Sequence, residues 1–214
     1  MIVVGLLLFF VVISVFTSNS YEDAAQSGFD ISNFNEGWTF VYQGQRQIDF
    51  YESLWDGKPS IYADYRQTKE KVFSLRRYIG SHIGKKVLSH IDPVADNFLI
   101  IGTGDKEDIR LIDWEYSGMQ DPHVDIAMFC IYALYDKQGI DRVIKAYFPE
   151  GCPEEIRIKI YCYISVCGLL WSNWCEYKRN LGAEFGEYAL KQYDYAKNFF
   201  RNIEKVTING EPFP

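Results

Sequence analysis

The chain has 214 residues, of which 48% are hydrophobic and 17% aromatic, a composition that predicts a folded protein with one core or a small pair of lobes. The formal net charge of −7 argues against nucleic acid as a partner, because phosphate binding needs clustered Lys and Arg. The five cysteines show no CxxC spacing and are not paired with the three histidines at ligand spacing, so we expect reduced thiols in a cytoplasmic protein and no zinc site.

Residues 1–16 form an apolar segment, MIVVGLLLFFVVISVF, that contains no charged residue. The segment is slightly short for a membrane span, which needs about 20 residues, and it lacks the basic start of a secretory signal. Three interpretations therefore compete: a membrane anchor with contact to the bilayer, an uncleaved or atypical signal, and a buried strand or altered start site. Residues 17–46, polar and glycine-bearing, are expected to be a linker or the remnant of an N-terminal lobe.

Helical patterns dominate the rest of the chain. Val72, Leu75 and Ile79 recur at helical spacing, with Lys and Arg on the other side. Pro122 and Pro153 can each occupy a first helical turn. Four helices are expected, over residues 64–83, 123–135, 153–179 and 186–205. Residues 207–214 contain a glycine and two prolines and are predicted to form a flexible tail.

A β-hairpin is predicted between residues 98 and 112. The runs 98–101 and 109–112 are short and apolar, and the glycine-bearing stretch between them carries turn chemistry. A hairpin brings its two open ends together. Asn97, just before the first strand, and Asp113, just after the second, are therefore expected to be neighbours, with Asp92 in the loop that leads in.

The spacing His90-x-Asp92-x4-Asn97, followed by Asp113 after the hairpin, has a chemical logic. Phosphoryl transfer needs a carboxylate to orient the attacking hydroxyl, and oxygen ligands for the Mg²⁺ that bridges the nucleotide phosphates. In this interpretation Asp92 is the base, while Asn97 and Asp113 are the metal ligands. His90 would brace the loop through a hydrogen bond to the backbone. The competing interpretation is structural, because Asp and Asn also cap turns.

Three longer stretches, SHIDPVADNFLI, LIDWEYSGMQDPHVDIAMF and CGLLWSNWCEYK, resemble the bacterial choline kinase family within the aminoglycoside phosphotransferase-like superfamily. FYESLWDGKPSIYADY is similar to the segment ahead of the catalytic loop in that family. The resemblance implies an α+β, mostly helical fold. It would be a protein-kinase-like C-terminal lobe over residues 47–206, with a small β-hairpin that carries the metal site. The implied reaction is ATP-dependent phosphorylation of the choline hydroxyl, with Mg²⁺, to give phosphocholine.

The resemblance also implies roles for single residues. Asp92 matches the catalytic base of the family, and Asn97 and Asp113 match its magnesium ligands. Trp171 and Trp174 match the aromatic residues that enclose the quaternary ammonium. Their i, i+3 spacing places both rings on one face of the expected helix, and Trp is the best cation–π partner. Aromatic pairs on buried helices are also typical of plain core, and that alternative stays open.

Further residues complete the expected substrate site and its support. Tyr177 continues the tryptophan face, and Glu115 would attract a cation unless it is a solvated loop carboxylate. Tyr132 is counted with the substrate-binding residues, although an apolar helix is a typical place for a core tyrosine. Asp125 either caps the helix in which it lies or braces the catalytic loop together with His90.

A kinase-like fold also has an N-terminal lobe, with a loop over the phosphates and a Lys that pairs with them. The sequence contains no GxGxxG and no Lys before Lys58, so we expect a C-terminal lobe whose nucleotide lobe is absent or truncated. The activity of this chain alone is therefore an open question. Two alternatives to a choline kinase remain. One is a kinase of ethanolamine, an aminoglycoside or another small alcohol. The other is a truncated or pseudokinase chain that acts as a binding module.

Overall fold

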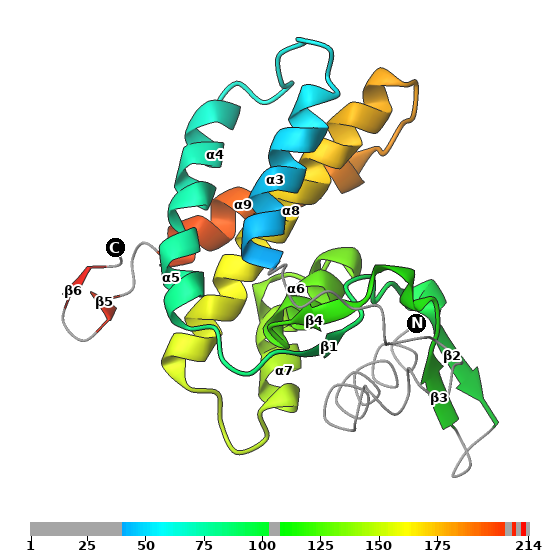
Figure 1. The fold of residues 1–214 in the computed structure, drawn as a ribbon, viewed down its shortest axis with the longest axis vertical. Helices are drawn as coiled ribbons and strands as arrows, with labels where there is room; N and C mark the ends of the chain where they lie inside the picture. The colour runs from blue at the N-terminus through cyan, green and yellow to red at the C-terminus, as the bar shows by residue number, and fades with distance from the viewer. Residues whose placement is uncertain (1–39, 103–107, 204–206, 209–210, 213–214) are drawn as a thin grey trace. The chain divides into compact units, whose positions relative to one another are not determined.

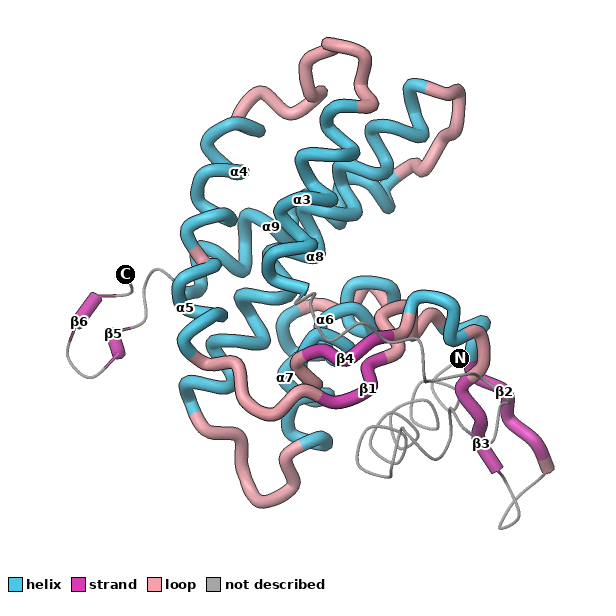
Figure 2. Tube along the Cα trace, in the orientation of Figure 1, coloured by secondary structure: helices cyan, strands magenta, loops and turns pink. Residues whose placement is uncertain are grey.

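The computed structural model describes residues 40–102, 108–203, 207–208 and 211–212, and the apolar segment 1–16 lies outside the described residues. The chain divides into two compact units. We call the described residues of Lys85–Pro153 the loop unit, and those of Thr39–Gly84 and Glu154–Pro214 the helical unit. Figures 1 and 2 show the elements of each unit, and the mostly helical character expected from the sequence is confirmed.

The helical unit is built around one long helix, α8 (Glu154–Asn180). Residues 158–170 of α8 are buried without interruption, which is the pattern of a helix enclosed by other elements. The neighbouring helices α9 (Glu187–Ile203) and α3 (Phe40–Ser53) pack against it. In Figure 1 both can be followed alongside α8.

Gly168 lets α8 and α9 approach each other closely. A Cβ at this position would lie 2.6 Å from Tyr195 Cβ and 2.7 Å from Gln192 O, distances at which the atoms would overlap. One turn earlier, Ser165 Oγ donates to Ala196 O over 2.7 Å and ties the same two helices together. The separation of the helices at this point therefore requires a residue without a side chain.

The helix expected over residues 64–83 is interrupted. It forms α4 (Tyr65–Ser74) and α5 (Arg76–Ser81), which join at Leu75. At the junction Leu75 N donates to Val72 O, and the hydroxyl of Ser74 donates to Lys71 O over 2.6 Å, competing for a carbonyl of the helical ladder. The predicted apolar face survives the break, because Val72, Leu75 and Ile79 are all buried.

The loop unit contains two separate two-stranded antiparallel sheets. β2 (Phe98–Ile101) and β3 (Asp108–Leu111) form the predicted hairpin. β1 (Val87–Ser89) pairs with β4 (Gly118–Gln120). This second sheet was not predicted, because three-residue strands are too short to show an alternating pattern. It fixes the chain directly before His90.

Two helices complete the loop unit. α6 (His123–Tyr132) is the predicted apolar helix, and it ends earlier than expected because Leu134 adopts a left-handed φ of 53°. α7 (Lys137–Tyr147) was not predicted. It begins after Asp136, whose carboxylate accepts the N–H of Gly139 over 2.8 Å as a helix cap.

The described residues near the two ends of the chain are also ordered into elements. α3 begins at Phe40, so residues 40–46 of the expected linker are helical. In the range expected to be a flexible tail, β5 (Thr207–Ile208) pairs with β6 (Glu211–Pro212). Of the helices that the structure describes, none combines the length and hydropathy that crossing a bilayer requires.

All five cysteines are free thiols. Cys130, Cys162, Cys167 and Cys175 are buried, whereas Cys152, just before α8, is partly exposed. Burial raises the pKa of the Cys130 thiol, and it raises that of Cys175 to about 12. Four of the cysteines are therefore unreactive core residues, as their spacing suggested.

Candidate active site

One buried carboxylate holds the backbone that enters the candidate catalytic loop. Asp125, in the first turn of α6, is 2% exposed. Its Oδ2 accepts the N–H of His90 and its Oδ1 accepts the N–H of Ile91, each over 2.8 Å. Burial raises the pKa of Asp125 to about 7, and the two backbone bonds act in the opposite direction. Only the ionised carboxylate accepts well at both oxygens, so the charge of Asp125 and the shape of the loop are linked.

Ile91 has a strained backbone directly before Asp92. Its φ is +72°, a left-handed value that costs an ordinary L-residue about 1–2 kcal/mol and is rarest for a β-branched one. The bond from Ile91 N to Asp125 is a contact that offsets this cost. The direction of the backbone between the end of β1 and Asp92 is therefore imposed by tertiary contacts rather than by local preference.

His90 lies beneath the loop as a neutral ring. It is 1% exposed, and its Nε2 lies 2.8 Å from Ile112 O. Burial lowers the pKa of His90, while the bond to this carbonyl raises it. A carbonyl can only accept, so Nε2 carries the proton in this contact. The bond ties the loop to the end of β3, and the ring also meets Trp114 edge to face at 4.9 Å.

Asp92 and Asn97 are joined through a tight turn. The backbone O of Asp92 accepts the N–H of Val94 over 2.8 Å and the side-chain Nδ2 of Asn97 over 2.9 Å. The short helix η2 (Ala95–Asn97) then leads into β2. Since Nδ2 of the buried Asn97 is used as a donor, Oδ1 is the atom with which this residue can bind a metal.

The open end of the hairpin brings Asn97 next to the residues before Asp113. Asn97 O accepts the N–H of Ile112 over 2.9 Å. Asp113 follows with a left-handed φ of +65°, a conformation that Asp tolerates better than most residues, and it is exposed. Trp114, buried in η4 (Trp114–Tyr116), donates Nε1 to Leu111 O over 2.9 Å and anchors this turn.

Asn97 and Asp113 suit Mg²⁺ better than a metal that needs a cage of protein ligands. Within the described part of the chain, no group of three or more His, Cys, Asp and Glu could hold a metal ion. Mg²⁺ is commonly bound through one or two carboxylates, with water and substrate phosphates completing its shell. One amide and one carboxylate at the end of a hairpin fit that mode of binding.

In the helical unit a second group of candidate residues gathers near the end of α8. Trp171 and Trp174 meet edge to face, with ring centroids 5.4 Å apart. Tyr177 stacks on Tyr51 of α3 at 6.3 Å, and Phe185 lies 5.2 Å from Trp174. We call these five rings the aromatic cluster. Both tryptophans and Tyr177 keep some exposed surface, unlike the fully buried residues earlier in α8.

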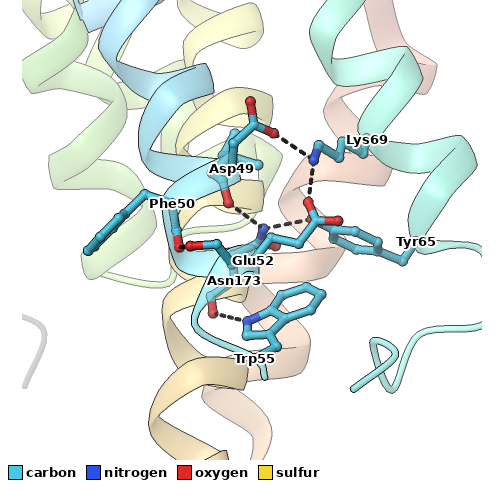
Figure 3. A network of polar contacts seen from close by, with 9 residues as sticks. Asp49, Phe50, Glu52, Trp55, Tyr65, Lys69 and Asn173 are labelled. Atoms are coloured by element: carbon cyan, nitrogen blue, oxygen red, sulfur yellow. Dashed lines mark hydrogen bonds and ion pairs between the residues drawn. The ribbon is translucent and has the colours of Figure 1, made fainter. Parts of the chain in front are cut away.

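Another face of α8 is locked by the buried side chain of Asn173. Its Nδ2 donates to Tyr65 over 2.7 Å and to Ile48 O over 3.3 Å. Its backbone O accepts Nε1 of Trp55 over 3.1 Å, as Figure 3 shows. These bonds hold α8 against α3, α4 and the loop between them.

Glu176 extends this lock toward the end of the helix. The carboxylate is 3% exposed and accepts Ser60 Oγ over 2.6 Å and the N–H of Ile61 over 3.0 Å. Burial raises the pKa of Glu176, and these two hydrogen bonds lower it. Glu176 is two residues after Trp174 and so faces away from it on the helix. The bonds of Glu176 therefore set the rotation of α8, and with it the direction of the tryptophan face.

A pocket of about 810 Å³ lies between α3, α4 and the intervening loop. Its lining includes Asp49, Glu52, Lys69 and Trp55. Figure 3 shows Lys69 bridging the two carboxylates, at 2.7 Å from Asp49. No residue predicted from the sequence to act in catalysis or binding lines this pocket, so its size is not an argument for function.

Comparison with protein families assigns the chain. A family model described as choline/ethanolamine kinase matches residues 22–141, which is more than half of the sequence. The chain belongs to the choline/ethanolamine kinase family. The family expected from the sequence motifs is thus confirmed.

A relative within this family is protein LicA of Haemophilus influenzae. It is 34% identical over 170 residues, which cover 73% of this chain and 58% of LicA. A second LicA sequence from that organism is 33% identical, with 46% of its length covered. The chain thus spans roughly half of the length of these relatives.

Solved structures share the fold. The choline kinase LicA from Streptococcus pneumoniae superposes with a TM-score of 0.61 at 26% identity, over 89% of this chain and 66% of that one. A structure of LicA in complex with AMP gives 0.60 at the same identity, over 89% and 64%. A choline/ethanolamine kinase family protein from Mesorhizobium loti gives 0.62 at 23% identity, over 86% and 64%, and shows the fold alone. The expected protein-kinase-like C-terminal lobe is confirmed.

In this choline/ethanolamine kinase family chain, the predicted site residues fall in both units. The loop unit holds His90, Asp92, Asn97, Asp113, Glu115, Asp125 and Tyr132, and the helical unit holds Trp171, Trp174 and Tyr177. The loop unit brings the first four and Asp125 together through the bonds described above. Glu115 is exposed in η4, and Tyr132, partly buried, is the last residue of α6.

The sequence did not indicate several residues that shape these two groups. Tyr51 and Phe185 are far along the chain from the tryptophans that they accompany, so no local pattern shows them. Asn173 and Glu176 did leave a signal. They are polar residues inside a strongly apolar helix, which calls for buried hydrogen-bond partners.

Proposed function

We propose that the chain acts in the transfer of the γ-phosphoryl group of ATP to the hydroxyl of choline, giving phosphocholine. The observation that carries the proposal is the closed loop of hydrogen bonds through Asn97, which joins it to Asp92 on one side and to Ile112 on the other. Asp92, Asn97 and Asp113 are thereby gathered at one end of the hairpin. Family membership and the likeness to proteins named choline kinases support the same chemistry.

Asp92 has the role of base. It orients the choline hydroxyl and takes its proton as the oxygen attacks the γ-phosphorus. One P–O bond forms, the P–O bond to the β-phosphate breaks, and ADP leaves. Asn97 Oδ1 and Asp113 would hold Mg²⁺, which neutralises charge on the phosphates.

The exposed apolar side of the hairpin favours a nucleotide as the donor. Leu99 is paired with Arg110, and side chains alternate along a strand, so Leu99 and Ile112 point to the same face. Both are exposed for large apolar residues, at 42% and 38%. These two exposed apolar side chains, which share their face with Arg110, lie next to the proposed metal residues and offer contacts for a purine ring.

The aromatic cluster favours a quaternary ammonium acceptor. Trp171, Trp174 and Tyr177 offer ring faces, which attract a cation without needing hydrogen bonds from it. A primary ammonium such as that of ethanolamine carries three N–H donors and is best met by carboxylates or carbonyls. Aromatic rings therefore suit the trimethylammonium group of choline, which has no N–H donors. They would leave the three N–H donors of ethanolamine without acceptors. We therefore assign choline, rather than ethanolamine or an aminoglycoside, to the helical unit.

The experiment measures product and binding separately. The purified chain is incubated with ATP, Mg²⁺ and choline, and phosphocholine is detected by ³¹P NMR. Choline affinity is measured by tryptophan fluorescence. Asp92→Asn should abolish product and leave choline affinity within a few-fold. Asp96→Asn, an exposed carboxylate in the same loop, is the matched control and should keep both.

The outcomes separate the alternatives. Full turnover by Asp92→Asn would contradict the base, and a preference for ethanolamine would contradict the acceptor. A wild-type chain that binds choline and never gives product would be a binding module instead of an enzyme. Loss of choline binding in Asp92→Asn would mean that this residue holds the substrate rather than the proton.

A further inference from the structure

The aromatic cluster already holds a cation that belongs to the chain itself. The Nζ of Lys178 lies 5.7 Å from the ring centroid of Trp174 and 5.8 Å from that of Tyr177. Both distances are within the range of a cation–π interaction. Lys178 is four residues after Trp174, so on α8 the two side chains are neighbours on one face. Its side chain is partly buried rather than extended into solvent.

In the part of the chain that the structure describes, no carboxylate draws Lys178 away from the rings. Among the ion pairs between described residues, none involves Lys178, whereas the next residue, Arg179, lies 3.9 Å from Glu176. Both oxygens of Glu176 are already engaged by Ser60 and Ile61. Lys178 also lies in the last turn of α8, where the helix dipole favours a positive charge. The ammonium is thus kept near the rings, and no carboxylate among the described residues pairs with it.

We propose that Lys178 is a specificity-determining residue, whose ammonium occupies the ring faces that a quaternary ammonium ligand must take and thereby weakens the binding of that ligand. This inference rests on the proposed function, because it concerns the same aromatic cluster. An incoming cation must displace Nζ from Trp174 and Tyr177. It also meets the repulsion of a like charge that remains tethered close by.

The tethered ammonium discriminates between acceptors. Ethanolamine offers the rings a primary ammonium, the same group that Lys178 supplies without any loss of translational freedom. A trimethylammonium group has no N–H donors and is held by ring faces in aromatic cages. Displacing Lys178 therefore costs choline less affinity than it costs ethanolamine. Lys178 thus lowers the affinity of the aromatic cluster for every cation, and the loss is smallest for quaternary ammonium groups, which suit aromatic rings.

The test compares the affinity of lysine variants of the full chain for choline and for tetramethylammonium, by calorimetric titration. Lys178→Met removes the charge and keeps the length of the side chain, and it should bind both ligands about three- to tenfold more tightly. Lys178→Arg keeps a cation that stacks on rings and should remain near wild type. The control is Lys71→Met, since Lys71 also lies over a ring, Phe200 at 5.6 Å, outside the aromatic cluster. Its affinity should not change.

The outcomes separate the role of Lys178 from the assignment of choline as the ligand. Wild-type binding that is unchanged or weakened in Lys178→Met overturns this inference and leaves the choline site standing. Absence of binding in wild type and variant alike overturns the inference together with the choline assignment. Should the methionine variant unfold, Lys178→Gln, which removes the charge and stays polar, is measured in its place with the same expected gain.

Discussion

The Oδ1 atom of Asp125 accepts the N–H of Ile91 over 2.8 Å and holds that residue in a left-handed conformation immediately before Asp92. The Oδ2 atom accepts the N–H of His90, also over 2.8 Å. One fully buried carboxylate thus determines how the chain turns out of β1. The position of Asp92 depends on a residue that cannot itself reach a substrate, because it is buried in α6.

Asp125→Ala should destabilise the fold and disorganise the loop. The change leaves two buried backbone N–H groups without an acceptor, at about 1–3 kcal/mol each, so we expect a loss of about 2–6 kcal/mol in the free energy of unfolding. Denaturant unfolding followed by circular dichroism measures it. Asp136→Ala, which removes the exposed cap of α7, should cost only about 1 kcal/mol. Equal losses in the two variants would contradict the special role of Asp125.

The ionisation of Asp125 should make stability fall as pH rises. Its folded pKa, about 7, stands above the unfolded value of about 3.9, so the folded chain binds the proton more strongly. The contribution of this group is fully present below about pH 4 and is lost as pH rises through about 7. Unfolding of wild type and Asp125→Asn is compared from pH 5 to 8. The wild type should show the steeper decline, and parallel curves would refute the shift.

Truncation of either tryptophan should weaken choline binding. Trp171→Ala and Trp174→Ala each remove a ring face, and we expect about 1–2 kcal/mol of lost affinity for a partly desolvated cation site. Fluorescence of the remaining tryptophans or calorimetry measures the affinity. The control is Trp55→Phe, because Trp55 is buried and bonded to Asn173 away from the aromatic cluster. It should lose stability and keep its affinity. Reduced stability with unchanged affinity in the two alanine variants would show that Trp171 and Trp174 are plain core.

Gly168→Ala should destabilise the helical unit. Its Cβ would lie 2.6 Å from Tyr195 Cβ, and the strain of separating α8 from α9 should cost about 1–3 kcal/mol. Gly80→Ala in α5 provides the contrast, because no atom lies within 4 Å of the added Cβ. That variant should be neutral or gain up to about 1 kcal/mol from helix propensity. Thermal unfolding of the two variants beside wild type decides the matter.

Features that depend on neighbouring residues in the chain were predictable. The hairpin followed from two apolar runs and a glycine-bearing turn, and the approach of Asn97 to Ile112 and Asp113 followed from the hairpin. The long helix α8 followed from Pro153 and the apolar run behind it. Each of these depends on contacts that lie close along the sequence.

Features that depend on distant contacts were not predictable. The pairing of β1 with β4 joins short segments that are separated by the whole hairpin. The bonds of Asp125 to His90 and Ile91 cross 35 and 34 positions, so the sequence could only leave bracing and capping as alternatives. The missed α7 is different, since its cap at Asp136 and its apolar positions Ile140, Val143 and Ile144 at helical spacing are both local signals in the sequence.

Because the cysteines differ in burial, the number of thiols that react with a labelling reagent distinguishes the folded chain from the unfolded one. Of five thiols, only Cys152 offers exposed surface, at the boundary between the loop unit and α8. A maleimide should therefore attach once to the native chain and five times after unfolding. Mass spectrometry of the labelled chain would then report, molecule by molecule, whether a variant of Asp125 or Gly168 has kept its core closed.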